Sequence, residues 1–79
     1  MKDTLTYIIT SLVENPEAVA VEENEEDGLI TYTVTVDKED MGKIIGKEGK
    51  VIRGIRNIMK VKAMKEDKRI NITLAEIPQ

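Results

Sequence analysis

Hydrophobic residues follow two different spacings along this chain, and these spacings predict both helices and strands. Between residues 3 and 14 they recur every three or four positions, which is typical of an amphipathic helix. We expect Asp3 to cap this helix and Asn15-Pro16 to end it, because proline disfavours helical geometry in the residue before it. Between residues 29 and 36 apolar residues alternate with threonines, which predicts a strand with one buried and one polar face.

The remaining patterns complete the order α-β-β-α-α-β. The other predicted elements are a strand over residues 18–23, a polar turn over 24–28, a short helix over 38–45, a long helix over 50–65 and a final strand over 69–75. Asp37 is placed to cap the short helix, and Asp40 resembles the second member of a capping box. In the long helix, the side chains expected to face inward are those of Val51, Ile52, Ile55, Ile58, Met59 and Ala63.

This order predicts an α+β fold built on a three-stranded mixed sheet. The first two strands are close enough in sequence to form an antiparallel hairpin, whereas the third follows two helices, a crossover long enough for parallel pairing. We expect all the helices on one face of the sheet, because the clearest strand has a single apolar face. At 79 residues the chain is expected to form one domain, residues 1–79.

Composition narrows the chemistry further. The chain has no cysteine and no histidine, which removes disulfides, thiolate nucleophiles, the usual zinc ligands and imidazole acid–base catalysis. It also lacks the P-loop pattern, so we expect no enzyme, no cofactor and no metal site. No apolar run is long enough to span a bilayer, and the first thirteen residues lack the continuous apolar stretch of a signal peptide. We therefore expect a cytoplasmic protein with no membrane partner.

Charge is distributed unevenly along the chain. The net charge is −3, but residues 1–42 hold eleven acidic and two basic side chains, and residues 43–69 hold three acidic and ten basic ones. A folded molecule could therefore present one acidic and one basic face. For nucleic-acid binding, such local clustering matters more than the sum of the charges. The alternative is that these lysines and arginines only solvate one helix.

The turn between the two later helices carries the clearest candidate chemistry. Gly46 and Gly49 lack a Cβ, so the backbone there can adopt positive φ and approach a ligand closely. The first amides of the helix that follows lack intrahelical acceptors and lie at the positive end of its dipole, which attracts an anion such as a phosphate. Lys43, Lys47 and Lys50 add positive charge around the same point.

The sequence from Ile44 to Gly49, I-I-G-K-E-G, resembles the I-G-x-x-G signature of KH domains, whose G-x-x-G loop clamps the backbone of about four nucleotides. Together with residues 15–19, 40–47 and 52–56, this stretch makes the chain similar to the small bacterial single-KH-domain RNA-binding proteins, the KhpA/YlqC family. Three positions depart from the usual pattern of that family. They are the acidic Glu48 in the loop, Lys50 where arginine is frequent and Gly54 where alanine is usual.

The resemblance implies a type II KH fold, with the loop at residues 46–49, that binds single-stranded RNA as an RNA chaperone or post-transcriptional regulator. It also implies pairing, as a homodimer or as a heterodimer with another KH-domain protein. The residues expected to bind RNA are Lys43, Ile44, Ile45, Gly46, Lys47, Glu48, Gly49, Lys50, Ile52, Arg53 and Arg56.

In this interpretation, Ile44, Ile45 and Ile52 form the floor of a narrow groove beside the strand at residues 29–36. For Ile44 and Ile52, packing in the core is an equally good explanation. The two tyrosines are the only aromatic residues, which argues against base stacking on aromatic side chains. A second hypothesis is a protein-interaction or dimerisation module that uses the basic amphipathic helix 50–65 and binds RNA weakly or not at all. Neither hypothesis distinguishes RNA from single-stranded DNA.

Overall fold

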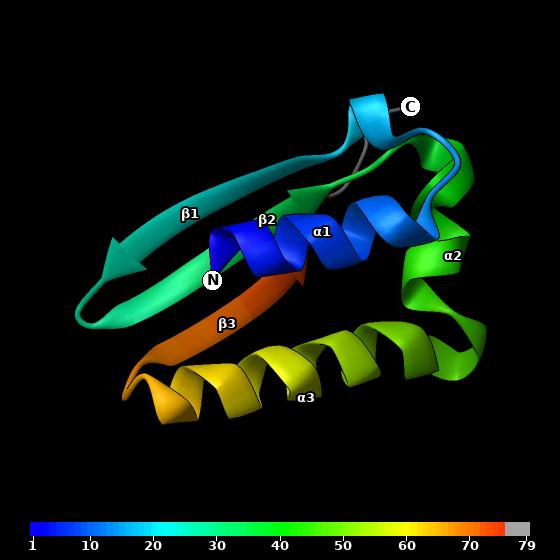
Figure 1. Cartoon of the computed structure of the whole chain (residues 1–79). Helices are drawn as coiled ribbons and strands as arrows, with labels where there is room; N and C mark the ends of the chain where they lie inside the picture. Colours follow the sequence, from blue (N-terminus) through cyan, green and yellow to red (C-terminus); the bar gives the residue numbers. More distant parts are fainter. Residues whose placement is uncertain (76–79) are drawn as a thin grey trace.

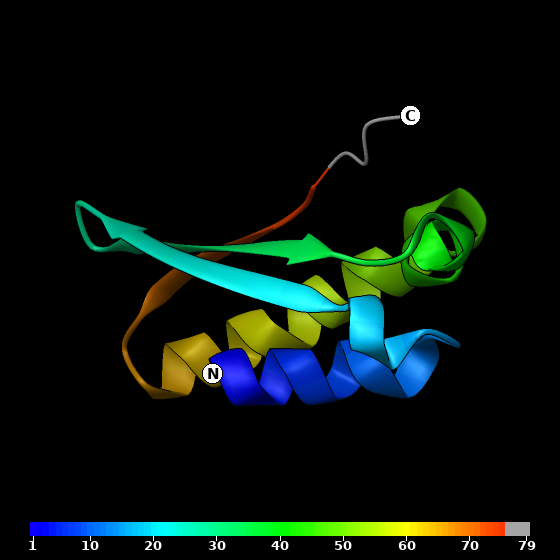
Figure 2. The same ribbon diagram turned by 90° about the horizontal axis from the view of Figure 1, so that it is seen from above.

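The computed structural model describes residues 1–75 and shows a three-stranded sheet with helices packed against one face (Figure 1). The elements are α1 (Lys2–Leu12), η1 (Pro16–Ala18), β1 (Ala20–Glu26), β2 (Leu29–Thr35), η2 (Lys38–Asp40), α2 (Met41–Ile45), η3 (Lys47–Gly49), α3 (Lys50–Lys65) and β3 (Arg69–Leu74). Seen from above, α1 and α3 lie on the same side of the sheet, and α2 lies at one end of it (Figure 2). The predicted order α-β-β-α-α-β and the α+β class are confirmed.

The sheet has the order β1-β2-β3 and is mixed, as predicted. β1 pairs antiparallel with β2, from Ala20 opposite Thr35 to Glu26 opposite Leu29. β2 pairs in parallel with β3, from Leu29 opposite Arg69 to Val34 opposite Leu74. Because β2 is central, the free edges of the sheet belong to β1 and β3. α1 packs under β1 and α3 packs under β3, which leaves the threonine face of β2 uncovered by helices.

The first hairpin is longer and tighter than the sequence predicted. β1 extends to Glu26, and the turn contains only Asp27 and Gly28, whose φ angles are 52° and 81°. Two consecutive positive φ angles are typical of the type I′ turn that connects strands through two residues. The prediction of a strand at 18–23 and a turn at 24–28 was therefore wrong in its boundaries. Val21 is the one buried residue of β1, so backbone pairing with β2, and not an apolar pattern, defines this strand.

One of the two predicted N-caps differs from the structure, and the other is confirmed. α1 begins at Lys2 with Met1 at the N-cap, so Asp3 lies in the first turn, where its charge still favours the helix dipole. Asp37 does cap the next helical segment, since its carboxylate accepts a hydrogen bond from the Glu39 amide at 2.9 Å. That segment begins with the short 3-10 helix η2 before it continues as α2. No helix within residues 1–75 is both long and apolar enough to span a bilayer.

The hydrophobic core lies between the sheet and the helices. Its buried members are Leu5, Ile9, Val21, Tyr32, Val34, Val36, Ile44, Ile52, Ile55, Met59, Ala63 and Ile72. Burial raises the pKa of Tyr32 to about 12, and the carboxylates of Glu23 and Glu66 add to the shift. One predicted core residue of α3 is wrong, because the side chain of Ile58 is 57% exposed. It lies on the side of the helix that turns away from the sheet.

Candidate nucleic-acid interface

The turn between α2 and α3 is built from left-handed backbone conformations. Gly46 has φ 74° and ψ 176°, a combination that is essentially restricted to glycine. Glu48 and Gly49 follow with φ 57° and 74°. Two backbone hydrogen bonds close the turn, from the Gly46 amide to the Gly42 carbonyl at 2.8 Å and from the Gly49 amide to the Gly46 carbonyl at 3.2 Å. The backbone therefore holds a fixed shape and directs the side chains of Lys47 and Glu48 toward solvent.

The start of α3 follows this turn directly. Gly49 is its N-cap, and no side chain caps the helix. The Lys50 amide donates a hydrogen bond back to the Lys47 carbonyl, and the next amides of this 16-residue helix stand at the positive end of its dipole without intrahelical acceptors. Lys47 and Lys50, in the turn and at the first position of α3, are both exposed. This arrangement suits a phosphate group, with the exposed Glu48 as the one opposing charge in the turn.

Arg53 folds back over the turn from the next turn of α3. Its Nη2 donates a hydrogen bond to the Glu48 carbonyl at 2.8 Å, and its Nε donates to the Gly49 carbonyl at 3.4 Å. Arg53 thus fixes Glu48 and Gly49, two of the three residues of the turn that hold positive φ, in addition to placing a positive charge beside them. The sequence predicted Arg53 as an RNA contact and gave no sign that it also shapes the turn.

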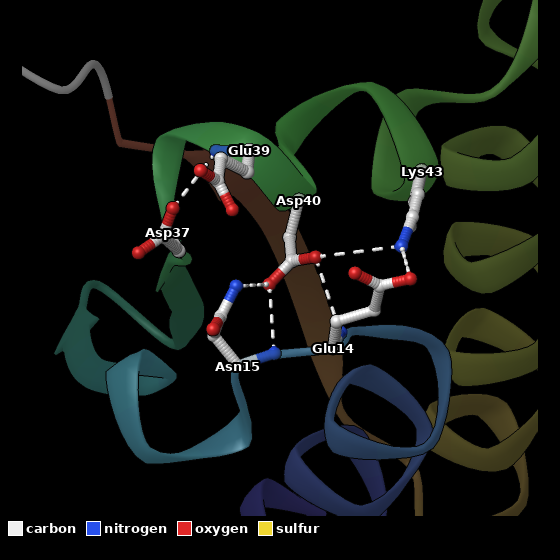
Figure 3. A network of polar contacts seen from close by, with 6 residues as sticks. All are labelled: Glu14, Asn15, Asp37, Glu39, Asp40 and Lys43. Carbon is white, nitrogen blue, oxygen red and sulfur yellow. Dashed lines mark hydrogen bonds and ion pairs between the residues drawn. The ribbon is translucent and has the colours of Figure 1, made fainter.

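Lys43 is a residue of α2, and its side chain extends toward Glu14 at the end of α1 (Figure 3). Its Nζ is 2.8 Å from a Glu14 carboxylate oxygen and 3.8 Å from Oδ1 of Asp40 (Figure 3). The ammonium group is therefore directed toward the end of α1, where two carboxylates balance its charge. Although Lys43 was predicted as part of the phosphate site, in this conformation its charge serves the contact between α1 and α2.

Asp40 holds the chain that leaves α1 against the start of α2. Its side chain is buried and accepts hydrogen bonds from the Glu14 amide at 3.1 Å, the Asn15 amide at 3.0 Å and Nδ2 of Asn15 at 3.1 Å (Figure 3). Desolvation raises the pKa of this carboxyl, but the hydrogen bonds and the Lys43 charge outweigh it and leave the pKa below its usual value. The capping-box role was wrong, because the carboxylate bonds to residues 25 and 26 positions away.

The predicted isoleucine floor is only partly accessible. Ile44 is fully buried and Ile52 is 6% exposed, so both pack in the core and have almost no surface with which to contact a ligand. Ile45, at 38% exposure, is the member of the predicted set that reaches the surface. The predicted position of the groove, beside the strand at residues 29–36, is also wrong. That strand is β2, which is central in the sheet and has β1 and β3 on its two sides.

A groove does exist beside the free edge of β3. It has a volume of about 330 Å³ and lies between α3 and β3, lined by Arg56, Lys60, Ile70, Asn71 and Ile72. We call it the α3–β3 groove. Nε of Arg56 donates a hydrogen bond to the Ile72 carbonyl at 3.2 Å, which fixes the guanidinium at the strand edge. Such an edge also offers backbone donors and acceptors to a ligand. Among the predicted site residues, Arg56 lies in this groove.

A different side of α3 is apolar and exposed. Ile58 and Val61 are 57% and 55% exposed, and they follow Gly54 at four and seven positions, the spacing of one helix face. A Cβ built at Gly54 would meet no atom within 4 Å, so the helix surface there is open. We call Gly54, Ile58 and Val61 the apolar stripe of α3. Arg56 and Lys60, by contrast, face β3.

The G-x-x-G turn, the two helices that it joins and the parallel return strand together define a KH domain. Residues 2–74 match the family model described as KhpA/KhpB, KH domain. Proteins named RNA-binding protein KhpA are similar over almost their whole length. The relative from Chlamydia caviae is 42% identical over 76 residues, with 96% of this chain and 97% of the relative covered. The relative from Listeria monocytogenes serovar 1/2a is 37% identical over 76 residues, with coverages of 96% and 100%.

The chain therefore belongs to the KhpA/KhpB KH-domain family, as the sequence motifs indicated. Its relatives bear the name of a binding protein and not of an enzyme, in agreement with the prediction of a non-enzymatic protein. Two structures of Era share the fold, with TM-scores of 0.64 for Era from Aquifex aeolicus bound to GDP and AlF4⁻ and 0.66 for Era in complex with MgGDPNP and part of 16S ribosomal RNA. In both, the identity is 21%, and the match covers 92% of this chain and 28% of the Era chain.

Proposed function

We propose that this chain binds single-stranded RNA, with the turn Gly46–Gly49 against the sugar–phosphate backbone and the α3–β3 groove against unpaired bases. The observation that carries the proposal is the position of these two features on one helix. α3 begins at the turn, and seven residues into the helix Arg56 is already in the groove. A strand held by its phosphate at the turn can therefore continue directly into the groove. The relatives named as RNA-binding proteins support the same conclusion.

The groove favours unpaired bases over a duplex. Its partly exposed aliphatic side chain, that of Ile70, comes from a strand edge, where a flat base can lie and also reach backbone donors and acceptors. A base that is already paired in a duplex cannot present its edge in this way. The small site and the absence of an aromatic platform imply weak recognition that tolerates many sequences, which suits an RNA chaperone or a post-transcriptional regulator acting in the cytoplasm.

Binding to short labelled strands at several salt concentrations tests this proposal. For about three or four phosphates contacted, and about −0.7 per phosphate, log affinity should fall with log salt at a slope near −2 to −3. Duplex RNA of the same length should bind worse. Equal affinity for duplex and single strand, or a slope steeper than about −6, would show that the lysines bind any phosphate backbone and that the groove plays no part.

A second function, self-association, is favoured by the apolar stripe of α3. Two adjacent aliphatic side chains that are more than half exposed, beside an open glycine, suit close packing of one helix against another. Because the stripe and the α3–β3 groove occupy different sides of α3, a dimer formed through the stripe would leave both RNA grooves accessible. A KH-domain partner with a similar helix could replace the second copy.

Analytical ultracentrifugation of the wild type and of Ile58→Asp tests self-association. The wild type should sediment as a dimer and the variant as a monomer, because a charge at this exposed position is harmless in the monomer but is buried without a partner in the dimer. The matched control is Lys38→Asp, a change at an exposed position in η2 outside the stripe, which should remain dimeric. A wild type that stays monomeric at all concentrations would exclude this function.

A further inference from the structure

A second pocket continues the α3–β3 groove away from the Gly46–Gly49 turn. It has a volume of about 300 Å³ and lies where α3 ends and β3 begins. We call it the distal pocket. Its lining includes Leu29, Lys60, Met64, Lys68, Arg69 and Ile70. Lys60 and Ile70 also line the α3–β3 groove, so the two hollows are adjacent and share a wall along α3.

The composition of the distal pocket suits one nucleotide. Leu29 and Ile70 are partly buried, and Met64 is 77% exposed, so these side chains provide an apolar surface with a mobile, polarizable edge on which a base can lie. Lys60, Lys68 and Arg69 are exposed around it and can each reach a phosphate. Lys68 is 3.9 Å from a Glu66 carboxylate oxygen, an exposed pair that a phosphate can compete for.

The length of α3 sets how far an RNA strand must extend from the Gly46–Gly49 turn to reach the distal pocket. From Lys50 to Met64 the helix rises about 21 Å, at about 1.5 Å per residue, and at about 3.4 Å per stacked nucleotide this corresponds to roughly six nucleotides. Beyond the pocket, the tip of the β1–β2 hairpin carries Glu25, Glu26 and Asp27, all exposed. These carboxylates repel phosphate and close the path at this end.

We propose that the distal pocket is a second RNA subsite, which extends the footprint beyond the turn and the α3–β3 groove to about six nucleotides of one single strand. This inference rests on the proposed function, since it concerns the continuation of the same strand. The strand leaves the α3–β3 groove past Lys60, places a base against Met64 and Ile70, and ends with its phosphates near Lys68 and Arg69.

The test compares four- and ten-nucleotide oligouridines on three forms of the full chain by fluorescence anisotropy. The test variant is Lys68→Gln with Arg69→Gln, which removes two charges from the distal pocket. The matched control is Lys62→Gln with Lys65→Gln, which removes two charges from the same end of α3 but outside the lining of either pocket. Circular dichroism melts of all three forms establish that each is folded.

The test variant should lose two phosphate contacts, each of which contributes about 0.7 to the slope of log affinity against log salt. Its slope should therefore become shallower by about 1.4, and its affinity for the ten-nucleotide strand should fall roughly tenfold. For the four-nucleotide strand it should match the control variant. Equal losses on both strands, or equal losses in both variants, would overturn the subsite while leaving the proposed function intact. If neither strand bound the wild type, the proposed function itself would be wrong. A ten-nucleotide strand can bind in more registers than a four-nucleotide strand, so the affinities of the wild type for the two strands do not test the subsite. The test is the loss of affinity of each variant relative to the wild type on the same strand.

Discussion

Gly46 and Val51 are packed so closely that position 46 has no room for a side chain. A Cβ built on Gly46 would lie 2.7 Å from Cβ of Val51 and 2.9 Å from its backbone nitrogen. Since Val51 is in the first turn of α3, the glycine allows α2 to end directly against the start of the next helix. Gly49, only three residues further on, has nothing within 4 Å of its Cβ position. The two glycines of the G-x-x-G turn therefore have different roles.

Gly46→Ala is predicted to destabilise the fold severely. It introduces a clash with backbone as well as side-chain atoms, at a φ of 74° and ψ of 176° that alanine does not tolerate. We expect the free energy of unfolding to fall by at least about 3 kcal/mol, which combines strain of about 1–3 kcal/mol with the displacement of Val51. Urea denaturation followed by circular dichroism measures this loss.

Gly49→Ala serves as the comparison, because it adds the same methyl group in open space. It should cost about 1–2 kcal/mol for the left-handed conformation alone, and Gly49→Asn should cost less, since asparagine adopts this region more readily. If Gly46→Ala and Gly49→Ala were equally destabilised, the packing of Gly46 on Val51 would not explain the need for glycine.

The parts of the fold that were predicted correctly carry a strong periodic signal. The long helix was expected over residues 50–65 and spans Lys50–Lys65, because sixteen residues give several repeats of the helical pattern. β1 failed because Val21 is its one buried residue, so no two-residue alternation marks it. The Asp27-Gly28 pair, a good signal for a two-residue hairpin turn, could have corrected its boundary. Ile58 was assigned to the core because an apolar residue at helical spacing looks the same in the sequence whether its side chain is buried or exposed.

The candidate site was predictable in its glycines and charges but not in its long-range contacts. Nothing in the sequence around Asp40 indicates that it bonds to Glu14 and Asn15, because hydrogen bonds over such separations depend on the folded backbone. The same limit applies to the groove. Its location beside β3 follows from the strand order, which leaves β2 in the centre of the sheet.

Lys47→Asp is predicted to abolish RNA binding while the protein stays folded. Lys47 is exposed in the turn, so the substitution removes no packing but creates two adjacent carboxylates, with Glu48, where a phosphate must bind. Anisotropy with a short single-stranded RNA and circular dichroism would be measured on the same samples. Lys38→Asp, an equal change of charge at an exposed position in η2, is the control and should bind almost normally. Unchanged affinity of the Lys47 variant in a folded protein would remove the turn from the site.

Lys43→Gln should affect stability more than RNA binding. Its ammonium group is 2.8 Å from the exposed Glu14 carboxylate and 3.8 Å from the buried Asp40, and an exposed pair such as that with Glu14 contributes at most about 1 kcal/mol. The variant should therefore unfold at a slightly lower temperature but lose less affinity than Lys47→Gln. A larger loss of affinity for the Lys43 variant would show that the lysine leaves Glu14 to contact RNA.

Asp40 should make the stability of the protein depend on acid pH. Its pKa in the folded protein is below the usual value of about 3.9, so its carboxylate contributes stability above that value. This contribution should be lost as the pH falls through the lower pKa of the folded state, because protonation breaks the hydrogen bonds to Glu14 and Asn15. Asp40→Asn should lower the melting temperature at pH 7 by at least about 5 °C and weaken the acid dependence.

Glu39→Gln is the control for this experiment, since it removes an exposed carboxylate one residue away. Its melting temperature should stay close to that of the wild type at every pH. If Asp40→Asn retained the full acid dependence of the wild type, other carboxylates would have to be responsible for it.

Gly54→Ala tests both the stability of the monomer and the packing of a dimer through the apolar stripe. In a helix interior glycine costs about 0.5–1 kcal/mol relative to alanine, and no atom lies within 4 Å of the Cβ position at Gly54. The isolated domain should therefore gain stability, with a melting temperature higher by about 3–6 °C. If two copies pack closely through Gly54, Ile58 and Val61, the added methyl group should instead weaken the dimer. Thermal melts at low and high protein concentration separate these two effects. If the substitution raised the melting temperature at both concentrations in a protein that sediments as a dimer, the dimer contact would lie away from Gly54.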